Sequence, residues 1–402
     1  MATLLADELR QETGATVISG LLDKPGMLDA GDKHIIDTLI PDYSILEQAE
    51  YVYGLIDAYI GYTTRGCPNH CAFCAVGRLE PNFYHYLPLK RQVKSIEEVY
   101  GPKQHLVLLD NNVLASEQFE RIINDIIDLG FEKGARRMGK FRYVDFNQGL
   151  DLRLLTPDKM KLLSQIAIKP LRLAFDHISL QDDYISRVRL AVEHGITKIS
   201  TYVLYNYADT PEDFYKRLRI NVELNHKLGT EIYSFPMKYI PLNAKDRSYV
   251  GKHWNRRLLR GVQCILLATK GKVGTHLDFF EAAFGRSPEE FIEIAMMPEH
   301  YIIHRRHYEM NGASEWRNLF RTLTTAEKTD FMKAACDPTQ SISRADFQQL
   351  LSHYDISQDR NPVDSQSSKQ AGKSSDNRGA SKAGSLTGFQ NDSQDIENRQ
   401  SG

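Results

Sequence analysis

Three of the chain's five cysteines lie in the stretch Thr64-Arg65-Gly66-Cys67-Pro68-Asn69-His70-Cys71-Ala72-Phe73-Cys74. Their spacing is C-x-x-x-C-x-x-C, and the stretch directly follows a strand-like segment at residues 58–62. The triplet therefore sits in the loop that leaves the first predicted strand.

Cys67, Cys71 and Cys74 have a spacing that suits an iron–sulfur cluster. Three thiolates can hold three irons of a cubane, and the fourth iron then has no protein ligand. An iron with an open coordination position can bind a small chelating molecule as well as store an electron. The cysteines therefore predict a [4Fe–4S] cluster that activates a small molecule.

Two other uses of these cysteines are less favoured. A zinc site needs a fourth ligand, for which His70, Cys264 and Cys336 are candidates, but structural zinc usually takes two separated pairs of ligands. A disulfide would leave one of the three close cysteines unpaired, and nothing in the sequence suggests secretion. Zinc stays as the alternative to iron and sulfide.

The cysteine motif resembles that of the radical S-adenosylmethionine (SAM) enzymes, whose signature is C-x-x-x-C-x-aromatic-C. Phe73 supplies the aromatic residue before the third cysteine. The resemblance implies that Cys67, Cys71 and Cys74 bind the cluster and that Phe73 lies against the nucleoside of SAM. It also implies that the open iron chelates SAM, that an electron cleaves SAM to a 5′-deoxyadenosyl radical, and that this radical abstracts hydrogen from a substrate. A reducing partner such as flavodoxin or ferredoxin would supply the electron.

Composition agrees with a cytoplasmic enzyme. The chain has 402 residues, of which 42% are hydrophobic and 25% charged, so it can bury a sizeable core. It has no apolar segment long enough to span a bilayer and no signal peptide at its start, and no membrane partner is expected. A net charge of −2 gives no general attraction to nucleic acid.

From the cysteine motif onward, strand-like apolar segments alternate with helical patterns, which is typical of β–α units and a parallel sheet. Strands are expected at 58–62, 105–110, 141–147, 171–177, 196–205 and 231–240, and helices at 95–100, 117–129, 182–194, from 156 and after 210. Short right-handed crossovers bring the carboxyl ends of all strands to one edge. The fold class is therefore α/β, and the resemblance implies a partial (β/α)6 barrel of TIM type.

The barrel is expected to occupy part of the chain only. The predicted parts are an N-terminal extension at 1–57, the barrel at 58–241, a C-terminal helical segment at 242–351 and a disordered tail at 352–402. The tail is rich in Ser, Gln, Asn, Asp, Gly and Lys and almost lacks aliphatic residues, so it cannot bury enough apolar surface to fold. Helices are expected at 254–270 and 277–291.

The N-terminal extension adds a detail to the resemblance. The segment Ile40–Leu46 resembles the linker that precedes the cysteines in cobalamin-dependent radical SAM enzymes. Residues 1–57 are too few for a cobalamin-binding domain, and the chain has no D-x-H-x-x-G run. The chain is therefore expected to be related to the cobalamin-type subgroup without its cofactor.

Asp110, Asn111 and Asn112 end the second predicted strand, where radical SAM enzymes commonly bind the amino group of SAM with a short polar motif. A carboxylate or amide oxygen is a suitable acceptor for an ammonium donor. The sequence does not decide which of the three residues would do this. A strand-to-helix turn rich in capping residues is the structural alternative.

Other polar residues at strand ends complete the predicted site. Asn147 and Arg153 follow the third strand, and Arg153 can bind a carboxylate through two hydrogen bonds. Asp176 ends the fourth strand, where the resemblance implies contact with the ribose hydroxyls of SAM. For each of these residues, a structural role in an ion pair or cap is an equal alternative.

The predicted activity is reductive cleavage of SAM followed by radical chemistry on an unidentified substrate. Basic clusters at 252–260 and 304–307 leave open an RNA- or tRNA-modifying enzyme, although a solvated helix face is favoured for both clusters. A metal- or cluster-binding module without turnover is the alternative from another class. Two remaining cysteines are too few for a second cubane, which argues against sulfur insertion.

Overall fold

A computed structural model describes residues 6–14, short pieces between 17 and 35, and residues 39–48, 53–244, 246–336 and 344–354. The predicted tail lies outside the described residues except for 352–354. The chain forms two compact units, the first up to Trp254 with Lys272–Ala283, the second with Asn255–Gly271 and the described residues from Phe284 onward. No described helix combines the length and hydrophobicity needed to cross a bilayer.

Two three-stranded parallel sheets form the centre of the first unit. Their orders are β1-β2-β5 and β6-β7-β8, so the strands follow one another as in the chain. The strands are β1 (Ala58–Gly61), β2 (His105–Leu108), β5 (Val144–Phe146), β6 (Leu171–Ala174), β7 (Lys198–Tyr205) and β8 (Glu231–Lys238). The predicted α/β class with parallel strands is confirmed.

The two sheets meet through single bridges and not through a continuous ladder. Parallel bridges link Val144 with Ile168 and Leu150 with Leu173, close to the gap between β5 and β6. In the described part of the chain β1 and β8 do not pair, so the strands form no closed barrel. The partial (β/α)6 barrel stays a prediction.

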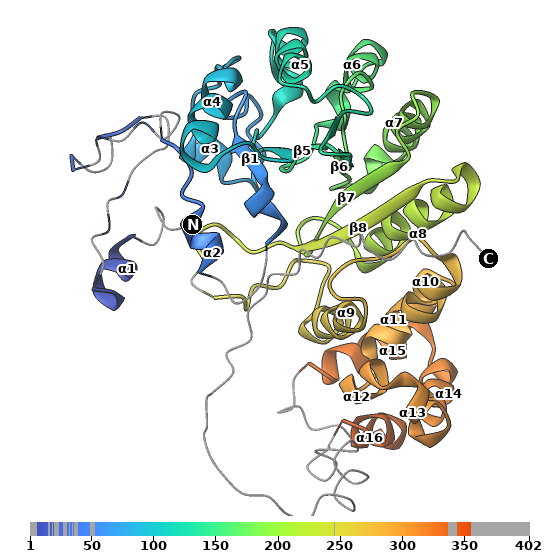
Figure 1. Ribbon diagram of the computed structural model, residues 1–402. Coiled ribbons are helices and arrows are strands. Elements are labelled where there is room, and N and C mark those ends of the chain that lie inside the picture. Colours follow the sequence, from blue (N-terminus) through green and yellow to red (C-terminus); the bar gives the residue numbers. More distant parts are fainter. Residues whose placement is uncertain are drawn as a thin grey trace, which may run out of the picture. The chain divides into compact units, whose positions relative to one another are not determined.

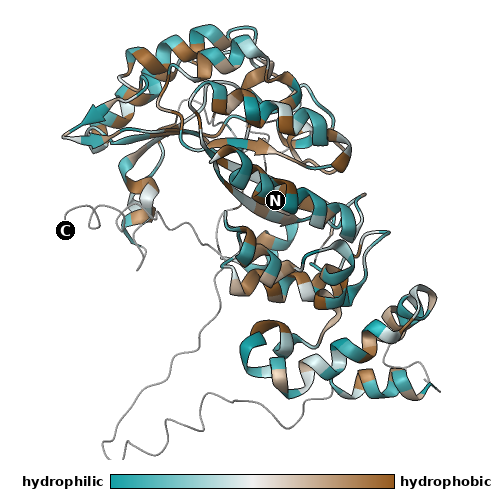
Figure 2. Cartoon of the chain, turned by 90° about the vertical axis from the view of Figure 1, so that its right-hand side faces the viewer, coloured by the Kyte–Doolittle hydropathy of each residue, from teal (hydrophilic) through white to brown (hydrophobic). Residues whose placement is uncertain are grey.

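A helix follows most strands and covers one side of the row (Figure 1). These helices are α4 (Leu89–Tyr100), α5 (Phe119–Asp128), α6 (Pro157–Leu163), α7 (Gln181–Glu193) and α8 (Pro211–Leu228). Hydrophobic and hydrophilic residues alternate along the helices of the chain (Figure 2), and the buried positions of α4 are the hydrophobic Leu89, Val93 and Ile96. The core of the unit lies between helices and strands, and includes Leu106, Leu108, Ile122, Phe146 and Leu173. Burying each such side chain contributes roughly 1.5–3 kcal/mol.

Local sequence explains where α8 begins and ends. The Thr210 side chain accepts a hydrogen bond from the Asp213 backbone, and the Asp213 side chain accepts one from the Thr210 backbone, which makes a capping box with Pro211 at the first position. Gly229 ends the helix at a φ of 63°, a left-handed conformation that favours glycine. The expected helix start after residue 210 is confirmed.

The third predicted strand is shorter than expected. Phe141, the first residue of the expected strand, belongs instead to a short antiparallel ribbon of β3 (Arg136–Arg137) and β4 (Lys140–Phe141). The parallel strand β5 begins only at Val144. Arg142 separates the ribbon from the strand, because its guanidinium donates to the backbone oxygens of Leu129 and Gly130. The expectation of one strand over 141–147 was therefore wrong at its start.

The second unit is helical. Its helices are α9 (Arg256–Ala268), α11 (Pro288–Met296), α12 (Glu299–Ile303), α13 (Arg305–Tyr308), α14 (Ser314–Thr322), α15 (Thr325–Ala334) and α16 (Ala345–Ser352). The helix expected at 277–291 was wrong, because α10 (Leu277–Phe284) ends before Gly285 and α11 starts after the capping Ser287. Gly285 has a φ of 88°, and a side chain there would meet Glu290. The other helices are α1 (Ala6–Glu12), α2 (Ser44–Glu47) and α3 (Val76–Leu79).

Candidate functional site

The three motif cysteines lie in the loop between β1 and α3, and all three are free thiols of intermediate exposure. The residues that lead into the loop are buried completely, since Thr63, Thr64 and Arg65 have no exposed surface. Gly66 follows at a φ of 73°, and a Cβ atom there would lie 2.1 Å from the backbone oxygen of Asn82. The residue before Cys67 must therefore be glycine.

Asp110 holds the start of the cysteine loop. Its Oδ1 atom accepts hydrogen bonds from the Thr63 nitrogen at 2.9 Å, the Thr63 hydroxyl at 2.7 Å and the Thr64 hydroxyl at 2.7 Å, and also from the Thr64 nitrogen. Burial raises the pKa of Asp110, while these donors partly offset the shift. Among the described residues its Oδ2 atom has no partner and is buried. One carboxylate oxygen of this predicted SAM-binding residue is thus already used within the protein.

Glu80, a residue that the sequence interpretation did not select, holds the next part of the loop. It accepts hydrogen bonds from the Arg65 guanidinium at 3.0 Å, the Gly66 nitrogen at 2.9 Å and the Asn111 amide at 2.6 Å. Arg65 also lies over the Tyr62 ring at 3.5 Å. The side-chain amide of Asn111, another predicted SAM contact, therefore donates a hydrogen bond to Glu80 within the protein. Nothing in the sequence separates Glu80 from an ordinary surface glutamate.

Asp151 holds the middle of the loop. Its carboxylate accepts hydrogen bonds from the Asn69 amide at 2.9 Å and from two nitrogens of Arg153 at 2.8 Å each. Burial alone would raise the pKa of Asp151, but the hydrogen bonds from Arg153 and Asn69 hold it below its ordinary value. Arg153 is itself exposed, whereas its carboxylate partner Asp151 is partly buried. The predicted ability of Arg153 to bind a carboxylate through two hydrogen bonds is used on Asp151.

Each of the three sulfurs has a donor or a positive charge next to it. The Asn112 amide donates to the Cys67 sulfur at 3.5 Å, and the Val76 nitrogen donates to the Cys74 sulfur at 3.5 Å. Burial raises the pKa of the Cys71 thiol, and the nearby positive charge of Arg153 opposes that shift. Hydrogen bonds to sulfur and nearby positive charge stabilise thiolates, and hydrogen bonds to sulfur tune iron–sulfur clusters.

Asn112 is a predicted residue whose side chain the structure brings into contact with a motif cysteine. It is buried, and besides Cys67 its amide reaches Asp151 at 3.4 Å. Its carbonyl oxygen Oδ1 is buried and has no hydrogen-bond partner among the described residues. Because a buried acceptor without a partner is costly, this atom is suited to accept a hydrogen bond from a bound molecule.

The donor set consists of three thiols, which as thiolates are the ligands that a cubane takes. Among the described residues no three His, Cys, Asp or Glu side chains lie close enough together to hold one metal ion. In a cubane each thiolate binds a different iron, so the three sulfurs need not converge on a single point. A small pocket of about 200 Å³ lies beside the loop, lined by His70, Cys71, Ala72, Cys74, Gly77 and Arg78.

Phe73 packs against aromatic side chains at the carboxyl ends of β7 and β8. Its ring lies 5.5 Å from that of Tyr207, which lies 4.7 Å from that of Tyr239, which in turn lies 5.5 Å from that of Tyr249. Asn206 supports this row, because its amide donates to the backbone oxygens of Tyr239 and Tyr249. At the end of β7, Asn206 thus contributes an anchor and Tyr207 an aromatic surface.

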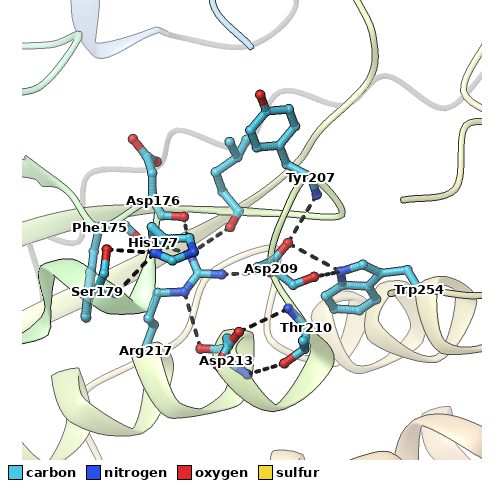
Figure 3. Close-up of polar contacts among 11 residues, drawn as sticks. Phe175, Asp176, His177, Ser179, Tyr207, Asp209, Thr210, Asp213, Arg217 and Trp254 are labelled. Carbon is cyan, nitrogen blue, oxygen red and sulfur yellow. Dashed lines mark hydrogen bonds and ion pairs between the residues drawn. The ribbon is translucent and has the colours of Figure 1, made fainter. Parts of the chain in front are cut away.

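Asp176 follows β6, and its surroundings are shown in Figure 3. The Arg217 guanidinium donates to its backbone oxygen at 3.1 Å and to the carboxylate of Asp209 at 2.8 Å, while the Asp176 carboxylate points away from Arg217. Burial raises the pKa of Asp176, and the charge of Arg217 opposes this. Arg217 therefore contacts the backbone oxygen of Asp176 and forms no ion pair with its carboxylate.

Arg217 itself was missed by the sequence interpretation. It comes from α8, is completely buried, and also donates to the backbone oxygens of Phe175 at 2.9 Å and Leu204 at 2.7 Å. Its carboxylate partner Asp209 accepts a further hydrogen bond from the Trp254 indole at 3.3 Å. One buried guanidinium thus ties together the residues that follow β6 and β7.

Asn147 lies at the end of β5, and its backbone oxygen accepts a hydrogen bond from the Tyr202 hydroxyl at 2.7 Å. Below it, Arg172 of β6 binds Asp145 of β5 through two hydrogen bonds of 2.6 and 2.7 Å. This buried ion pair was also missed, although a charged residue inside the apolar run Leu171–Ala174 is a signal that sequence reasoning can use. It places a charge pair between the two sheets near the predicted site.

The remaining two cysteines belong to the second unit. Cys264 is completely buried in α9, and burial raises the pKa of its thiol. Cys264 is therefore part of the packed interior of this unit. Cys336 follows α15 and has intermediate exposure.

No protein-family model matches the chain, and no curated protein matches its sequence. The solved structures that are similar to it include the following two. One is SuiB from Streptococcus suis bound to the precursor peptide SuiA, with a TM-score of 0.36, 13% identity, and 67% of this chain and 60% of that chain covered. The other is the radical SAM methyltransferase TsrM from Kitasatospora setae with tryptophan and a SAM analogue, with a TM-score of 0.33, 15% identity, and 60% and 46% covered.

The chain spans less than two thirds of each of these solved proteins. The functional assignment rests on the residues around the three cysteines.

Proposed function

We propose that the chain is a radical SAM enzyme with one [4Fe–4S] cluster held by Cys67, Cys71 and Cys74. The observation that carries the proposal is a triplet of free cysteines at C-x-x-x-C-x-x-C spacing, with a donor or a positive charge beside each sulfur. When bound, the cluster would supply the electron that cleaves SAM to a 5′-deoxyadenosyl radical, which abstracts hydrogen from the substrate. A flavodoxin or ferredoxin is the expected reducing partner.

The residues around the loop have separate roles in this proposal. Asn112 donates to Cys67 and keeps its own buried carbonyl oxygen for the amino group of SAM. Asp110, Asn111, Asp151 and Arg153 act mainly on the protein, since their side chains bond to Thr63, Thr64, Glu80, Asn69 and one another. They are positioning residues that hold the loop and place positive charge next to Cys71.

The nucleoside of SAM is assigned to the carboxyl ends of the later strands. Phe73 and Tyr207 provide an aromatic surface there, and Asp176 is the proposed acceptor for the ribose hydroxyls. Two vicinal hydroxyl donors suit a carboxylate, and the Asp176 carboxylate points away from Arg217. Asn147 is proposed to contact SAM or substrate through its side chain, because its backbone oxygen is already bonded to Tyr202.

The test begins with anaerobic reconstitution and measurement of iron, sulfide and zinc. Incubation with SAM and dithionite should then yield 5′-deoxyadenosine, detected by mass. Cys71→Ala should lose the cluster absorption and the product, because only two protein ligands for the cluster remain. The matched control is Cys336→Ala, which removes a cysteine of similar exposure outside the motif and should keep both.

Three outcomes contradict the proposal. A protein that takes up zinc but no iron would support a zinc-stabilised module. A protein with a full cluster but no 5′-deoxyadenosine, with or without candidate substrates, would support a cluster-binding module without turnover. Equal product from Cys71→Ala and wild type would place the chemistry elsewhere.

The RNA-modifying alternative is less supported by the surroundings of the basic residues. In the cluster at 252–260, Arg260 pairs with Glu299 at 2.6 Å, and Arg257 lies over the Tyr354 ring at 4.2 Å. Charges used within the protein contribute less to phosphate binding. Salt-dependent binding of RNA that is lost on changing Arg256 and Lys252 to alanine would restore this alternative.

A further inference from the structure

A second pocket lies at the opposite end of the strands from the cysteine loop. It has a volume of about 280 Å³ and is built from the residues that precede β5, β6 and β7. The cysteine loop and Asp110 follow the carboxyl ends of β1 and β2, whereas this pocket lies where strands begin. In β/α folds with chemistry at the carboxyl ends, this other edge has no role in the reaction, so the proposed function does not explain the pocket.

The walls of the pocket are fixed by backbone hydrogen bonds. The Lys133 nitrogen donates to the Gln165 oxygen at 2.7 Å, and the Val144 nitrogen donates to the Ala167 oxygen at 2.9 Å. The Lys169 nitrogen donates back to the Val144 oxygen at 2.9 Å. Three chain segments are thus locked side by side, so the pocket exists before any ligand arrives.

The lining of the pocket contains four cationic residues and no aspartate or glutamate. The cations are Lys133, Arg142, Lys169 and Lys198. Lys198 is neutralised by Glu231 at 2.7 Å, and Arg142 is used on backbone oxygens. In the described part of the chain, the ammonium groups of Lys133 and Lys169 have neither a hydrogen bond nor an ion pair, and Lys169 lies 4.0 Å from the centre of the Tyr143 ring.

Further positive charge next to the pocket adds to the positive electrostatic potential of its lining. The ribbon β3–β4 adds Arg136, Arg137 and Lys140, and its Phe141 is part of the pocket wall. Two ammonium groups without counter-ions in one concave site repel each other and lower the free energy of an anion placed between them. Lysine is a common phosphate ligand because its ammonium acts as a compact point charge.

The rest of the lining is apolar or aromatic. Ile168, which is half-buried, provides aliphatic surface, and Phe141 and Tyr143 provide rings. The His105 ring stacks on Tyr143 at 5.2 Å and holds it in place. A free inorganic anion would leave this surface uncovered. A ligand that combines phosphate groups with a flat apolar part fits both features of the pocket.

We infer that the pocket at the amino-terminal edge of the strands binds a phosphorylated small molecule of the nucleoside diphosphate class. Lys133 and Lys169 would bind its phosphates, and Phe141, Tyr143 and Ile168 would cover its base. The site is separate from the cysteine loop and does not depend on the proposed activity. Its ligand can therefore bind to the protein whether or not a cluster is present.

The test is calorimetric titration of the full chain at low ionic strength with GDP, pyrophosphate and guanosine. Guanine compounds are used so that an adenine-binding site for SAM does not contribute, and saturating S-adenosylhomocysteine is added as a further safeguard. GDP should bind at least ten-fold more tightly than guanosine, because guanosine lacks the phosphates. Pyrophosphate should bind more weakly than GDP, because it lacks the base.

Lys133→Ala combined with Lys169→Ala should weaken GDP binding at least ten-fold. The matched control is Lys216→Ala, an exposed lysine of α8 away from the pocket lining, which should bind GDP as wild type does. Circular dichroism and thermal midpoints check that the variants are folded, and Lys133→Ala alone, at an exposed position, serves as the milder second variant.

Several results would overturn the inference. These are no saturable GDP binding, guanosine binding as tight as GDP, or a double variant that binds GDP like wild type. Equal weakening by Lys216→Ala would show only general attraction between anions and a lysine-rich surface. Failure of SAM cleavage has no bearing on these readouts, and failure of GDP binding has none on SAM cleavage.

Discussion

Replacing Asp110 tests whether this residue organises the cysteine loop. Its Oδ1 atom accepts four hydrogen bonds from Thr63 and Thr64, all inside the protein. At about 1 kcal/mol for each net hydrogen bond, Asp110→Ala leaves four donors without a partner and should cost about 4 kcal/mol. Relief of the buried charge reduces this cost, so we expect a loss of about 2–4 kcal/mol in the free energy of unfolding. Asp110→Asn keeps one acceptor oxygen and should cost about 1 kcal/mol.

The assay can report on the first unit alone. The chain has two tryptophans, Trp254 in the first unit and Trp316 in the second. In a Trp316→Phe background, urea unfolding followed by fluorescence therefore reports on the unit that holds Asp110. The shift in the urea midpoint multiplied by the slope gives the change in free energy.

A double-mutant cycle identifies the source of the loss. Thr64→Val removes one hydroxyl donor and should cost about 1 kcal/mol in wild type but close to nothing in Asp110→Ala, because the acceptor is already absent. Equal cost in both backgrounds, or a loss below about 1 kcal/mol for Asp110→Ala, would refute the reasoning. Iron bound after reconstitution should fall in Asp110→Ala and stay near wild type in Asp110→Asn.

The pH dependence of the same variants has a defined sign. Burial raises the pKa of Asp110 in the folded protein above its ordinary value. The ionised form is therefore penalised in the folded state, and this penalty is absent below the pKa of the unfolded chain and grows as pH rises toward the folded pKa. The stability of wild type relative to Asp110→Asn should fall as pH rises from about 4. The opposite trend would show that the hydrogen bonds outweigh burial.

Two further substitutions test the surroundings of the site. Gly66→Ala places a Cβ atom 2.1 Å from the Asn82 backbone oxygen at a φ of 73°, so it should lower the free energy of unfolding by roughly 3 kcal/mol or more and reduce bound iron. The control Gly101→Ala has a similar φ of 72° with open space around it and should cost only about 1 kcal/mol. Equal effects of the two substitutions would show that the contact with Asn82 does not matter. Arg217→Met leaves Asp209 buried without its cation and should cost about 3–5 kcal/mol, of which the added Asp209→Asn should recover a part.

The backbone of the first unit was the most predictable part of the molecule. The strands β6, β7 and β8 start or end within two or three residues of the expected ranges, because long apolar runs bounded by Gly, Asp or Pro leave few choices. The strand expected at 141–147 failed because its first residues are held by the ribbon turn and by Arg142. The apolar character of the segment alone does not show that its first residues pair in a ribbon and do not join the parallel strand.

The polar contacts of the site were less predictable, because their partners are far away in the sequence. From the sequence, Asp110 at a strand end can equally be a cap or a ligand. In the structure it accepts hydrogen bonds from Thr63 and Thr64, which lie 47 and 46 residues earlier in the chain. Arg217 reads as a solvated residue of an amphipathic helix, yet the carbonyls of Phe175 and Leu204 surround it. Periodicity assigns a residue to a face, but not to partners on another strand.

These contacts share one physical consequence for the cysteine loop. Asp110 holds its start, Glu80 holds Gly66, and Asp151 holds Asn69, so three carboxylates from three different segments fix the loop without touching a cysteine. Ordering a free loop of this length around a cluster would cost backbone entropy of about 1–2 kcal/mol per residue. Because the protein has already fixed this backbone, the entropy of ordering the loop is lost when the protein folds and does not weaken cluster binding. The loop therefore depends on residues that a search for metal ligands would pass over, and its affinity for a cluster should fall when any one of the three carboxylates is removed.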